Sequence, residues 1–231
     1  MDLKTKGTFY GVGVGPGDPS FLTLRGAEVL GRCPVIAAPR TGGTMTALEI
    51  VRPVVDLTEK QVLPLDYSMS GDPARREAEH HAMIQAILDC LDRGRDVAMV
   101  NLGDSTLYAS VNQLAGPIRQ AGYPVELIPG VTSFSAASAA LGEPLAEGDV
   151  PVHILSALRD DWKTWLDLPG TKVLMKPGKR LPEVLAYLKE TGRTERAALV
   201  MDCGMAGEVR LVPFDRLPDR QSYFTLVIVK E

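Results

Sequence analysis

Short apolar runs alternate with amphipathic stretches through the first 130 residues. The apolar runs predict five strands, at residues 8–14, 34–38, 61–65, 96–100 and 124–128. Apolar positions at helical spacing predict three helices, at residues 22–30, 73–93 and 107–121. Pro73 suits the first turn of the longest helix, and Gly94 is placed to end it. Strands that alternate with helices indicate an α/β fold built on a parallel sheet.

The second half of the chain has a different pattern. A helix rich in small residues at 133–141 leads into a turn-rich segment, and we expect a domain boundary there, with domains at 1–145 and 146–231. Beyond it, apolar runs predict strands at residues 151–155, 171–175, 197–201 and 223–229, and helices at 162–166 and 182–190. Residues 207–213 alternate in polarity and predict a hairpin strand, so the second domain is expected to hold a mixed sheet.

Composition and charge exclude several classes of protein. The 231 residues carry 25 basic and 29 acidic side chains, a net charge of −4, so no basic excess favours nucleic-acid binding. No apolar run approaches the roughly 20 residues of a membrane span, and the N-terminus shows no signal peptide. We therefore expect no membrane partner and a cytoplasmic location. Cys33, Cys90 and Cys203 lack metal-binding or disulfide spacing and are expected to be buried thiols.

The first predicted strand ends in an unusual glycine-rich turn, Gly11-Val-Gly-Val-Gly-Pro-Gly-Asp18. The dinucleotide motif Gly-x-Gly-x-x-Gly fails in every register, which argues against an NAD-dependent oxidoreductase. No Gly-Lys-Ser/Thr follows, so a Walker loop is excluded, and Pro16 lacks the amide hydrogen of a phosphate cradle. The turn instead favours close approach of a ligand to backbone, or it is only a tight strand-to-helix turn.

Two more polar turns follow predicted strands. Asn101-Leu-Gly-Asp-Ser-Thr-Leu-Tyr108 follows the fourth strand, and Ile128-Pro-Gly-Val-Thr-Ser-Phe-Ser135 follows the fifth. Each alone is an ordinary loop. Since open α/β sheets bind ligands at the carboxyl ends of their strands, three such loops predict one site at a shared sheet edge.

In this order and spacing, the three turns resemble those of the tetrapyrrole methylases, the S-adenosylmethionine-dependent enzymes of cobalamin and sirohaem synthesis. The resemblance covers nearly the whole chain. The stretches at 34–39 with 47–50, at 63–70, at 94–104 and at 129–137 look most like members that methylate precorrin-2 or cobalt-precorrin-2 at C-20. The second turn departs from the family's usual Gly-Asp-Pro, because Ser105 follows Asp104.

The resemblance implies a two-domain tetrapyrrole methylase fold, a parallel-sheet domain followed by a mixed-sheet domain, in a homodimer. It implies S-adenosyl-L-methionine as cofactor, bound where the two domains meet, a tetrapyrrole substrate and no metal held by the protein. Carried over residue by residue, the cofactor contacts are Pro16, Leu102, Gly103, Asp104, Leu107, Thr132, Ser133 and Met175, and the loop 202–206 with Gly204 and Met205 completes the adenine pocket.

Direct methyl transfer to carbon asks the protein mainly to orient and desolvate the reactants. A base must accept a proton from the methylated macrocycle, and the candidate catalytic residues are Asp18, Asp104 and Tyr108. Each of them has positioning of the substrate as an equal alternative. The candidate partners for the carboxylates of the substrate are Arg40, Lys176, Lys179 and Arg180. The alternative, that they are ordinary charged residues of loops, is at least as well supported by the sequence.

Two alternatives to this activity stay open at this stage. One is a related methylase that acts on another macrocycle position or on uroporphyrinogen. The other is a non-catalytic module that binds tetrapyrrole or cofactor. The sequence does not distinguish a cobalt-containing substrate from a metal-free one.

Overall fold

The computed structural model describes residues 6–67, 72–157 and 159–231. Residues 1–5, at the N-terminus, and 68–70, part of one stretch used for the resemblance, lie outside the described residues. The chain divides into two compact units, residues 1–132 and 133–231. The boundary expected after residue 145 lies beyond helix α5, which here belongs to the second unit.

The first unit is a parallel five-stranded sheet with the strand order β3-β2-β4-β1-β5. Its strands are β1 (Phe9–Gly13), β2 (Val35–Arg40), β3 (Gln61–Asp66), β4 (Val97–Asn101) and β5 (Val125–Ile128). Its helices are α1 (Leu24–Arg32), α2 (Thr46–Val51), α3 (Pro73–Leu91) and α4 (Val111–Gln120), with the 3-10 turn η1 (Pro19–Phe21). The predicted parallel α/β domain is confirmed.

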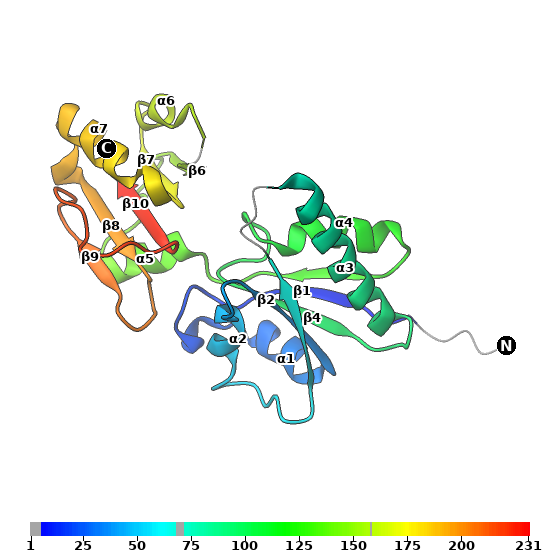
Figure 1. Ribbon diagram of the computed structural model, residues 1–231. Helices are drawn as coiled ribbons and strands as arrows, with labels where there is room; N and C mark the ends of the chain where they lie inside the picture. Colours follow the sequence, from blue (N-terminus) through cyan, green and yellow to red (C-terminus); the bar gives the residue numbers. More distant parts are fainter. Residues whose placement is uncertain (1–5, 68–71, 158) are drawn as a thin grey trace. The chain divides into compact units, whose positions relative to one another are not determined.

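Helices cover both faces of this sheet, and alternation along the strands explains why (Figure 1). On β1, Tyr10 and Val12 pack with the residues of α1 and α2, whereas Phe9 packs with those of α3 and α4. Neighbouring side chains of a strand point to opposite faces, so strands covered on both faces must be apolar throughout. This is why the sequence shows continuous apolar runs here.

The helices of this unit differ from the expected ones mainly in the start of α4 and the presence of α2. The helix expected from residue 107 begins only at Val111, and residues 107–110 belong to the loop after β4. Tyr108 has φ of 50°, a left-handed conformation that no helix interior accommodates. The short helix α2 was not expected, because six residues carry too little periodicity to distinguish them from a strand.

The second unit holds the predicted mixed sheet, and its strand order is β6-β7-β10-β8-β9. Its strands are β6 (Val152–Ser156), β7 (Thr171–Met175), β8 (Ala197–Met201), β9 (Val209–Leu211) and β10 (Thr225–Val229). Its helices are α5 (Ser133–Leu141), α6 (Trp162–Leu166) and α7 (Leu181–Glu190), with the 3-10 turns η2 (Gly178–Arg180) and η3 (Thr194–Arg196). The expected hairpin strand is β9, which pairs antiparallel with β8.

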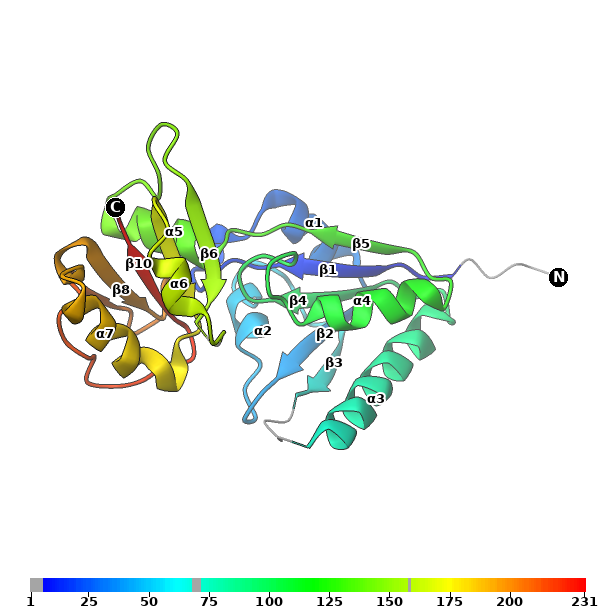
Figure 2. The same ribbon diagram turned by 90° about the horizontal axis from the view of Figure 1, so that it is seen from above.

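Figure 2 shows α5 and α7 on opposite sides of this second sheet. Trp162 of α6 and Leu185 of α7 pack against Leu199 and Val227 in one apolar core. Cys33, Cys90 and Cys203 are buried and free, as expected. Among the described residues no helix is long and apolar enough to cross a membrane.

Candidate functional site

The three glycine-bearing loops leave the same edge of the first sheet. β1 lies between β4 and β5 and is parallel to both, so the carboxyl ends of the three strands are adjacent. This confirms that the loops share a sheet edge, which is where open α/β sheets bind ligands.

Backbone hydrogen bonds join the first loop to the second. The amide of Gly15 donates to the carbonyl of Gly103 at 3.1 Å, and the amide of Gly103 donates to the carbonyl of Gly15 at 2.8 Å. The amide of Val14 donates to the carbonyl of Asn101 at 2.9 Å. The amides of Val14 and Gly15 in the turn after β1 therefore donate to β4 and the loop that follows it, and not to a ligand. This agrees with the lack of a phosphate-binding motif in this turn.

Glycine at two positions lets the third loop pack directly against the others. A Cβ built on Gly130 would lie 2.3 Å from the carbonyl oxygen of Gly103, and one built on Gly13 would lie 2.7 Å from the amide nitrogen of Gly130. Both contacts are with backbone, which cannot move aside as a side chain can. Any larger residue at either position would push the loops apart.

Gly103 is glycine for another reason. Its φ of 74° is left-handed, and the nearest atom to a Cβ built there is the carbonyl oxygen of Val131, 4.0 Å away. Packing of the described residues therefore leaves room beside this backbone. The positive φ accounts for glycine at this position, and the open space beside it leaves room for a ligand to approach the backbone.

The Asp104 carboxylate holds the second and third loops together. Its Oδ1 accepts hydrogen bonds from the amide of Thr106 at 2.7 Å and from the Thr106 hydroxyl, and its Oδ2 accepts one from the amide of Gly130 at 2.8 Å. Burial raises the pKa of this carboxyl, but the hydrogen bonds from Thr106, Gly130 and Leu107 outweigh burial and lower the pKa below its ordinary value. This geometry favours the positioning role over the proton-accepting role.

The other two candidate bases differ in their surroundings. Asp18 is exposed and caps η1, with Oδ1 accepting a hydrogen bond from the amide of Ser20 at 2.8 Å, which lowers the pKa of its carboxyl. Tyr108 is left-handed and 49% exposed, on the loop that leaves β4. Asp18 and Tyr108 are thus both exposed, whereas Asp104 is buried.

Four of the remaining predicted contacts lie on these same loops, and Ser133 directly follows the third loop as the first residue of the second unit. Pro16 is buried, and Leu102, Leu107 and Thr132 are half-buried. Ser133 begins α5 and is also half-buried. Half-burial leaves part of each side chain available to a ligand.

The second unit gathers its predicted contacts at one sheet edge as well. β7 and β8 are both antiparallel to β10 and therefore run in the same direction. Met175 ends β7, and the loop that carries Gly204 and Met205 follows β8. Leu226 of β10 pairs with Met175 of β7 on one side and with Val200 of β8 on the other, so Met175 and Val200 lie at the same level of the sheet.

Hydrogen bonds and ion pairs fix the loop after β8. Asp202 is buried, accepts a hydrogen bond from the Ser222 hydroxyl and pairs with Arg220 at 2.6 Å. The amide of Gly204 donates to Glu208 at 2.6 Å. Sequence reasoning missed these supporting carboxylates, because their partners lie up to 20 residues away and no local motif marks them.

Left-handed backbone marks both edges. Among the described residues, the non-glycine residues with positive φ are Tyr108, Lys176 and Asp202, at 50°, 56° and 53°. Each lies in a loop that follows a strand of the two edges, since Lys176 follows β7 and Asp202 follows β8. Such strain costs stability and gathers at functional sites, so its distribution supports the assignment of both edges.

The basic residues considered as substrate contacts are partly engaged already. Arg40 holds Asp66 with two hydrogen bonds, at 2.5 and 2.7 Å, where β2 and β3 end. Arg180 bonds to Asp160 at 2.6 Å, and the ammonium of Lys176 lies 5.5 Å from the centre of the Tyr223 ring. Lys179 is exposed in η2.

The fold and the loops define a two-unit α/β protein in which the candidate contacts lie at one edge of each sheet, and the turn after β1 lacks the phosphate-binding motifs of nucleotide-binding proteins. The family model for tetrapyrrole (corrin/porphyrin) methylases matches residues 8–216. The chain belongs to this family and is a methyltransferase.

Curated relatives resemble nearly the whole chain. A precorrin-2 C(20)-methyltransferase from Sinorhizobium sp is 31% identical over 96% of this chain and 95% of its own. A probable cobalt-precorrin-2 C(20)-methyltransferase from Methanocaldococcus jannaschii is 32% identical, again over 96% and 95%.

Solved structures share the fold. A uroporphyrin-III-C-methyltransferase from Thermus thermophilus has a TM-score of 0.70 at 28% identity, over 97% of this chain and 94% of that one. A uroporphyrin-III C-methyltransferase from the same organism, complexed with S-adenosylhomocysteine, has a TM-score of 0.68 at 22% identity, over 97% and 98%.

Proposed function

We propose that this protein transfers a methyl group from S-adenosyl-L-methionine to C-20 of precorrin-2 or cobalt-precorrin-2 in cobalamin biosynthesis. The proposal depends on the loops after β1, β4 and β5, which are joined at one sheet edge. Over nearly its whole length, the chain is about equally similar to a C(20)-methyltransferase named for precorrin-2 and to one named for cobalt-precorrin-2. The near-equal identity to the two types leaves the cobalt content of the substrate to experiment.

The residues of both edges fit this cofactor. At Gly103 the backbone is left-handed and the space beside it is open, as a ligand lying against the loop requires. We propose that the cofactor is held from the loops of the first sheet by Pro16, Leu102, Gly103, Asp104, Leu107 and Thr132. Ser133 would hold it from the start of α5, and Met175, Gly204 and Met205 from the edge of the second sheet. When bound, it supplies a methyl group on a positively charged sulfur.

The chain's own residues have the task of orientation. Asp104 fixes the second loop to the third, and the paired amides of Gly15 and Gly103 fix the first to the second. Loops that are held before the ligand arrives lose less conformational freedom on binding. Alignment of the reactants along one line then lowers the barrier through proximity.

Tyr108 is the residue we propose to contact the tetrapyrrole and to help move its proton. Its side chain is 49% exposed, and its left-handed backbone turns the loop after β4. Asp104 acts through the loops as a positioning residue, and Asp18 supports the first loop as a cap. Lys176 and Lys179 remain proposals for contacts with substrate carboxylates.

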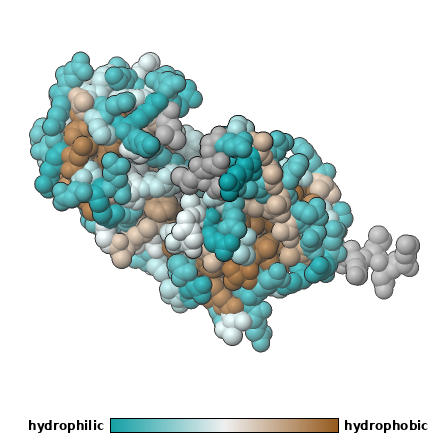
Figure 3. Space-filling model, in the orientation of Figure 1, coloured by the Kyte–Doolittle hydropathy of each residue, from teal (hydrophilic) through white to brown (hydrophobic). Residues whose placement is uncertain are grey.

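We also propose a homodimer in the cytoplasm. Exposed apolar side chains on the first unit, Leu24 at 92% and Val54 at 51% exposed, support a self-association surface. Figure 3 shows apolar residues, in brown, at the surface of this unit. Sedimentation measures the assembly directly, and a monomer at micromolar concentration would contradict the dimer.

Turnover with both substrates tests the function. The protein is incubated with S-adenosylmethionine and either precorrin-2 or cobalt-precorrin-2, and mass spectrometry and NMR locate the added methyl group. One new methyl on C-20 is expected with at least one substrate. A methyl on another carbon would make it a different member of the family, and cofactor binding without turnover would favour the binding module.

A further inference from the structure

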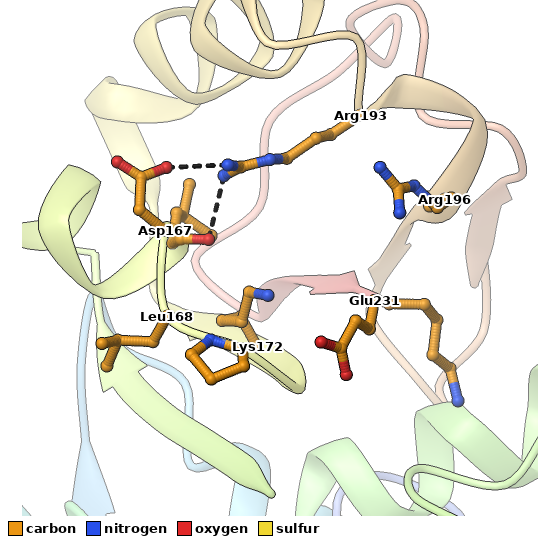
Figure 4. Close-up of a pocket in the computed structure, with 9 residues that line it drawn as sticks. Asp167, Leu168, Lys172, Arg193, Arg196 and Glu231 are labelled. Atoms are coloured by element: carbon orange, nitrogen blue, oxygen red, sulfur yellow. Dashed lines mark hydrogen bonds and ion pairs between the residues drawn. The ribbon is translucent and has the colours of Figure 1, made fainter. Parts of the chain in front are cut away.

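A basic pocket lies at the other edge of the second sheet, away from Met175 and Asp202. It has a volume of about 340 Å³, and its lining includes Lys172, Arg193, Arg196, Asp167 and Glu231 (Figure 4). Lys172 is near the start of β7, Arg196 precedes β8, and Glu231 follows β10. Five strand residues separate the two edges by about 13 Å, so this pocket is not part of the candidate cofactor edge.

The cations of the pocket are compensated only in part. Arg193 pairs with Asp167 at 2.8 Å and donates to the carbonyl of Leu166 at 2.9 Å. Lys172 donates to the carbonyl of Gly170 at 2.6 Å. Within the described part of the chain, the guanidinium of Arg196 makes no hydrogen bond or ion pair, and Figure 4 shows it turned toward the space between Arg193 and Glu231.

Like charges crowd this space. Lys172 is 5% exposed, and its burial, together with repulsion by Arg193, lowers the pKa of its ammonium group. Glu231 and Asp167 oppose this effect. The buried ammonium of Lys172 and the two nearby guanidinium groups repel one another, which destabilises the fold. An anion bound among them would offset this repulsion.

We propose that this pocket binds a small oxyanion with two or more negative charges, a phosphate or a polycarboxylate. Arg196 is the group with free donors, and its planar fork matches both kinds of oxyanion. The volume lies at the low end of small-molecule sites, which favours a compact anion over a macrocycle. The proposal does not rest on the methyltransferase activity.

Two substitutions with opposite expected effects test it. Arg196→Gln removes the free cation, and we expect it to weaken anion binding about tenfold or more. Glu231→Gln removes a competing carboxylate at the pocket, and we expect it to strengthen binding. Arg216→Gln is the matched control, because Arg216 is an exposed arginine of the same unit that does not line the pocket.

Calorimetric titration of the full chain with inorganic phosphate and with citrate, against sodium chloride at equal ionic strength, gives the affinities. Saturable binding that Arg196→Gln weakens and Arg216→Gln preserves supports the proposal, and the tighter of the two probes identifies the kind of anion. Circular dichroism of each variant confirms that it folds. No saturable binding in the millimolar range, or equal affinity in wild type and Arg196→Gln, would overturn the proposal. Unchanged binding of S-adenosylhomocysteine in Arg196→Gln keeps this result separate from the proposed function.

Discussion

Replacing Asp104 by asparagine should loosen the third loop of the first sheet edge. An amide offers one acceptor oxygen where the carboxylate offers two. We expect that oxygen to remain with the two Thr106 donors, so the new NH₂ group faces the amide of Gly130 and leaves it unpaired. Loss of a charge-assisted hydrogen bond and an unsatisfied, partly buried donor together cost about 2 kcal/mol of unfolding free energy.

Urea denaturation followed by far-ultraviolet circular dichroism measures this loss. Both tryptophans, Trp162 and Trp165, lie in the second unit, so their fluorescence reports on that unit separately. Hydrogen-exchange mass spectrometry should show faster exchange for residues 125–132 and unchanged exchange for residues 197–211. Affinity for S-adenosylhomocysteine should fall with the loop's order.

Asp18→Asn is the matched control for this experiment. It makes the same chemical change at an exposed cap with one backbone partner, where asparagine caps about as well as aspartate, so stability should change by less than about 0.5 kcal/mol. If Asp104→Asn kept wild-type stability and ligand affinity but lost turnover about a hundredfold, the loop-holding role would be wrong and Asp104 would be an acid–base residue.

The acid dependence of stability adds an independent check on Asp104. Its pKa is lower in the folded than in the unfolded chain, so the carboxylate's stabilisation is fully present above the unfolded pKa, near 3.8. It is lost as pH falls from there through the folded pKa. Between about pH 5 and 3, wild type should therefore lose stability more steeply than Asp104→Asn, and equal slopes would show that the carboxylate is not held by the fold.

Further predictions concern the loops and the two units. Gly130→Ala should cost about 3 kcal/mol or more of unfolding free energy, since a Cβ at this position meets a backbone oxygen at 2.3 Å. Gly103→Ala should cost only about 1–2 kcal/mol and mainly reduce the affinity for S-adenosylhomocysteine. Urea unfolding measures the stability of each variant and calorimetry its affinity, and equal losses of stability would contradict this distinction. Lys176→Gly removes the strain of a non-glycine residue at positive φ, so it should change the unfolding free energy by less than about 1 kcal/mol while weakening the binding of S-adenosylhomocysteine. A larger loss of stability would mean that the lysine side chain itself stabilises the fold. If one cofactor site uses residues of both units, residues 1–145 expressed alone should bind S-adenosylhomocysteine poorly, and full affinity in this fragment would refute a shared site.

Periodicity predicted most of the architecture because both sheets are covered by helices. Apolar runs such as 96–100 and 197–201 are strands buried on both faces, and their alternation with helices leaves few alternative topologies. The predicted start of α4 was wrong by four residues, since Leu107 continues the helical spacing of Val111 and Leu114 while Tyr108 takes a left-handed turn. Periodicity records which side chains are apolar and does not record the sign of φ.

The positions of the site loops were predictable, but the roles of their side chains were not. Carboxyl ends of adjacent parallel strands must meet, so the order of strands alone brings Gly13, Gly103 and Gly130 together. Whether Asp104 faces a ligand or the protein depends on the amide of Gly130, 26 residues away, and no local pattern specifies that contact. The same is true of Asp202, whose partners Arg220 and Ser222 come from a distant loop.

The two sheet edges follow one physical scheme. At each edge, the carboxylate of a buried aspartate in the loop after a strand accepts a hydrogen bond from a loop distant in sequence. Asp104 accepts from the amide of Gly130, and Asp202 accepts from the hydroxyl of Ser222. In each, a left-handed residue that is not glycine turns the chain at the same edge, Tyr108 in the first unit and Asp202 itself in the second. A carboxylate with several donors can hold a strained turn that isolated backbone would not keep. Because a methyltransferase must above all orient its reactants, we infer that Asp104 and Asp202 serve by holding the loops, and the proton of the methylated macrocycle is left to Tyr108 in our proposal.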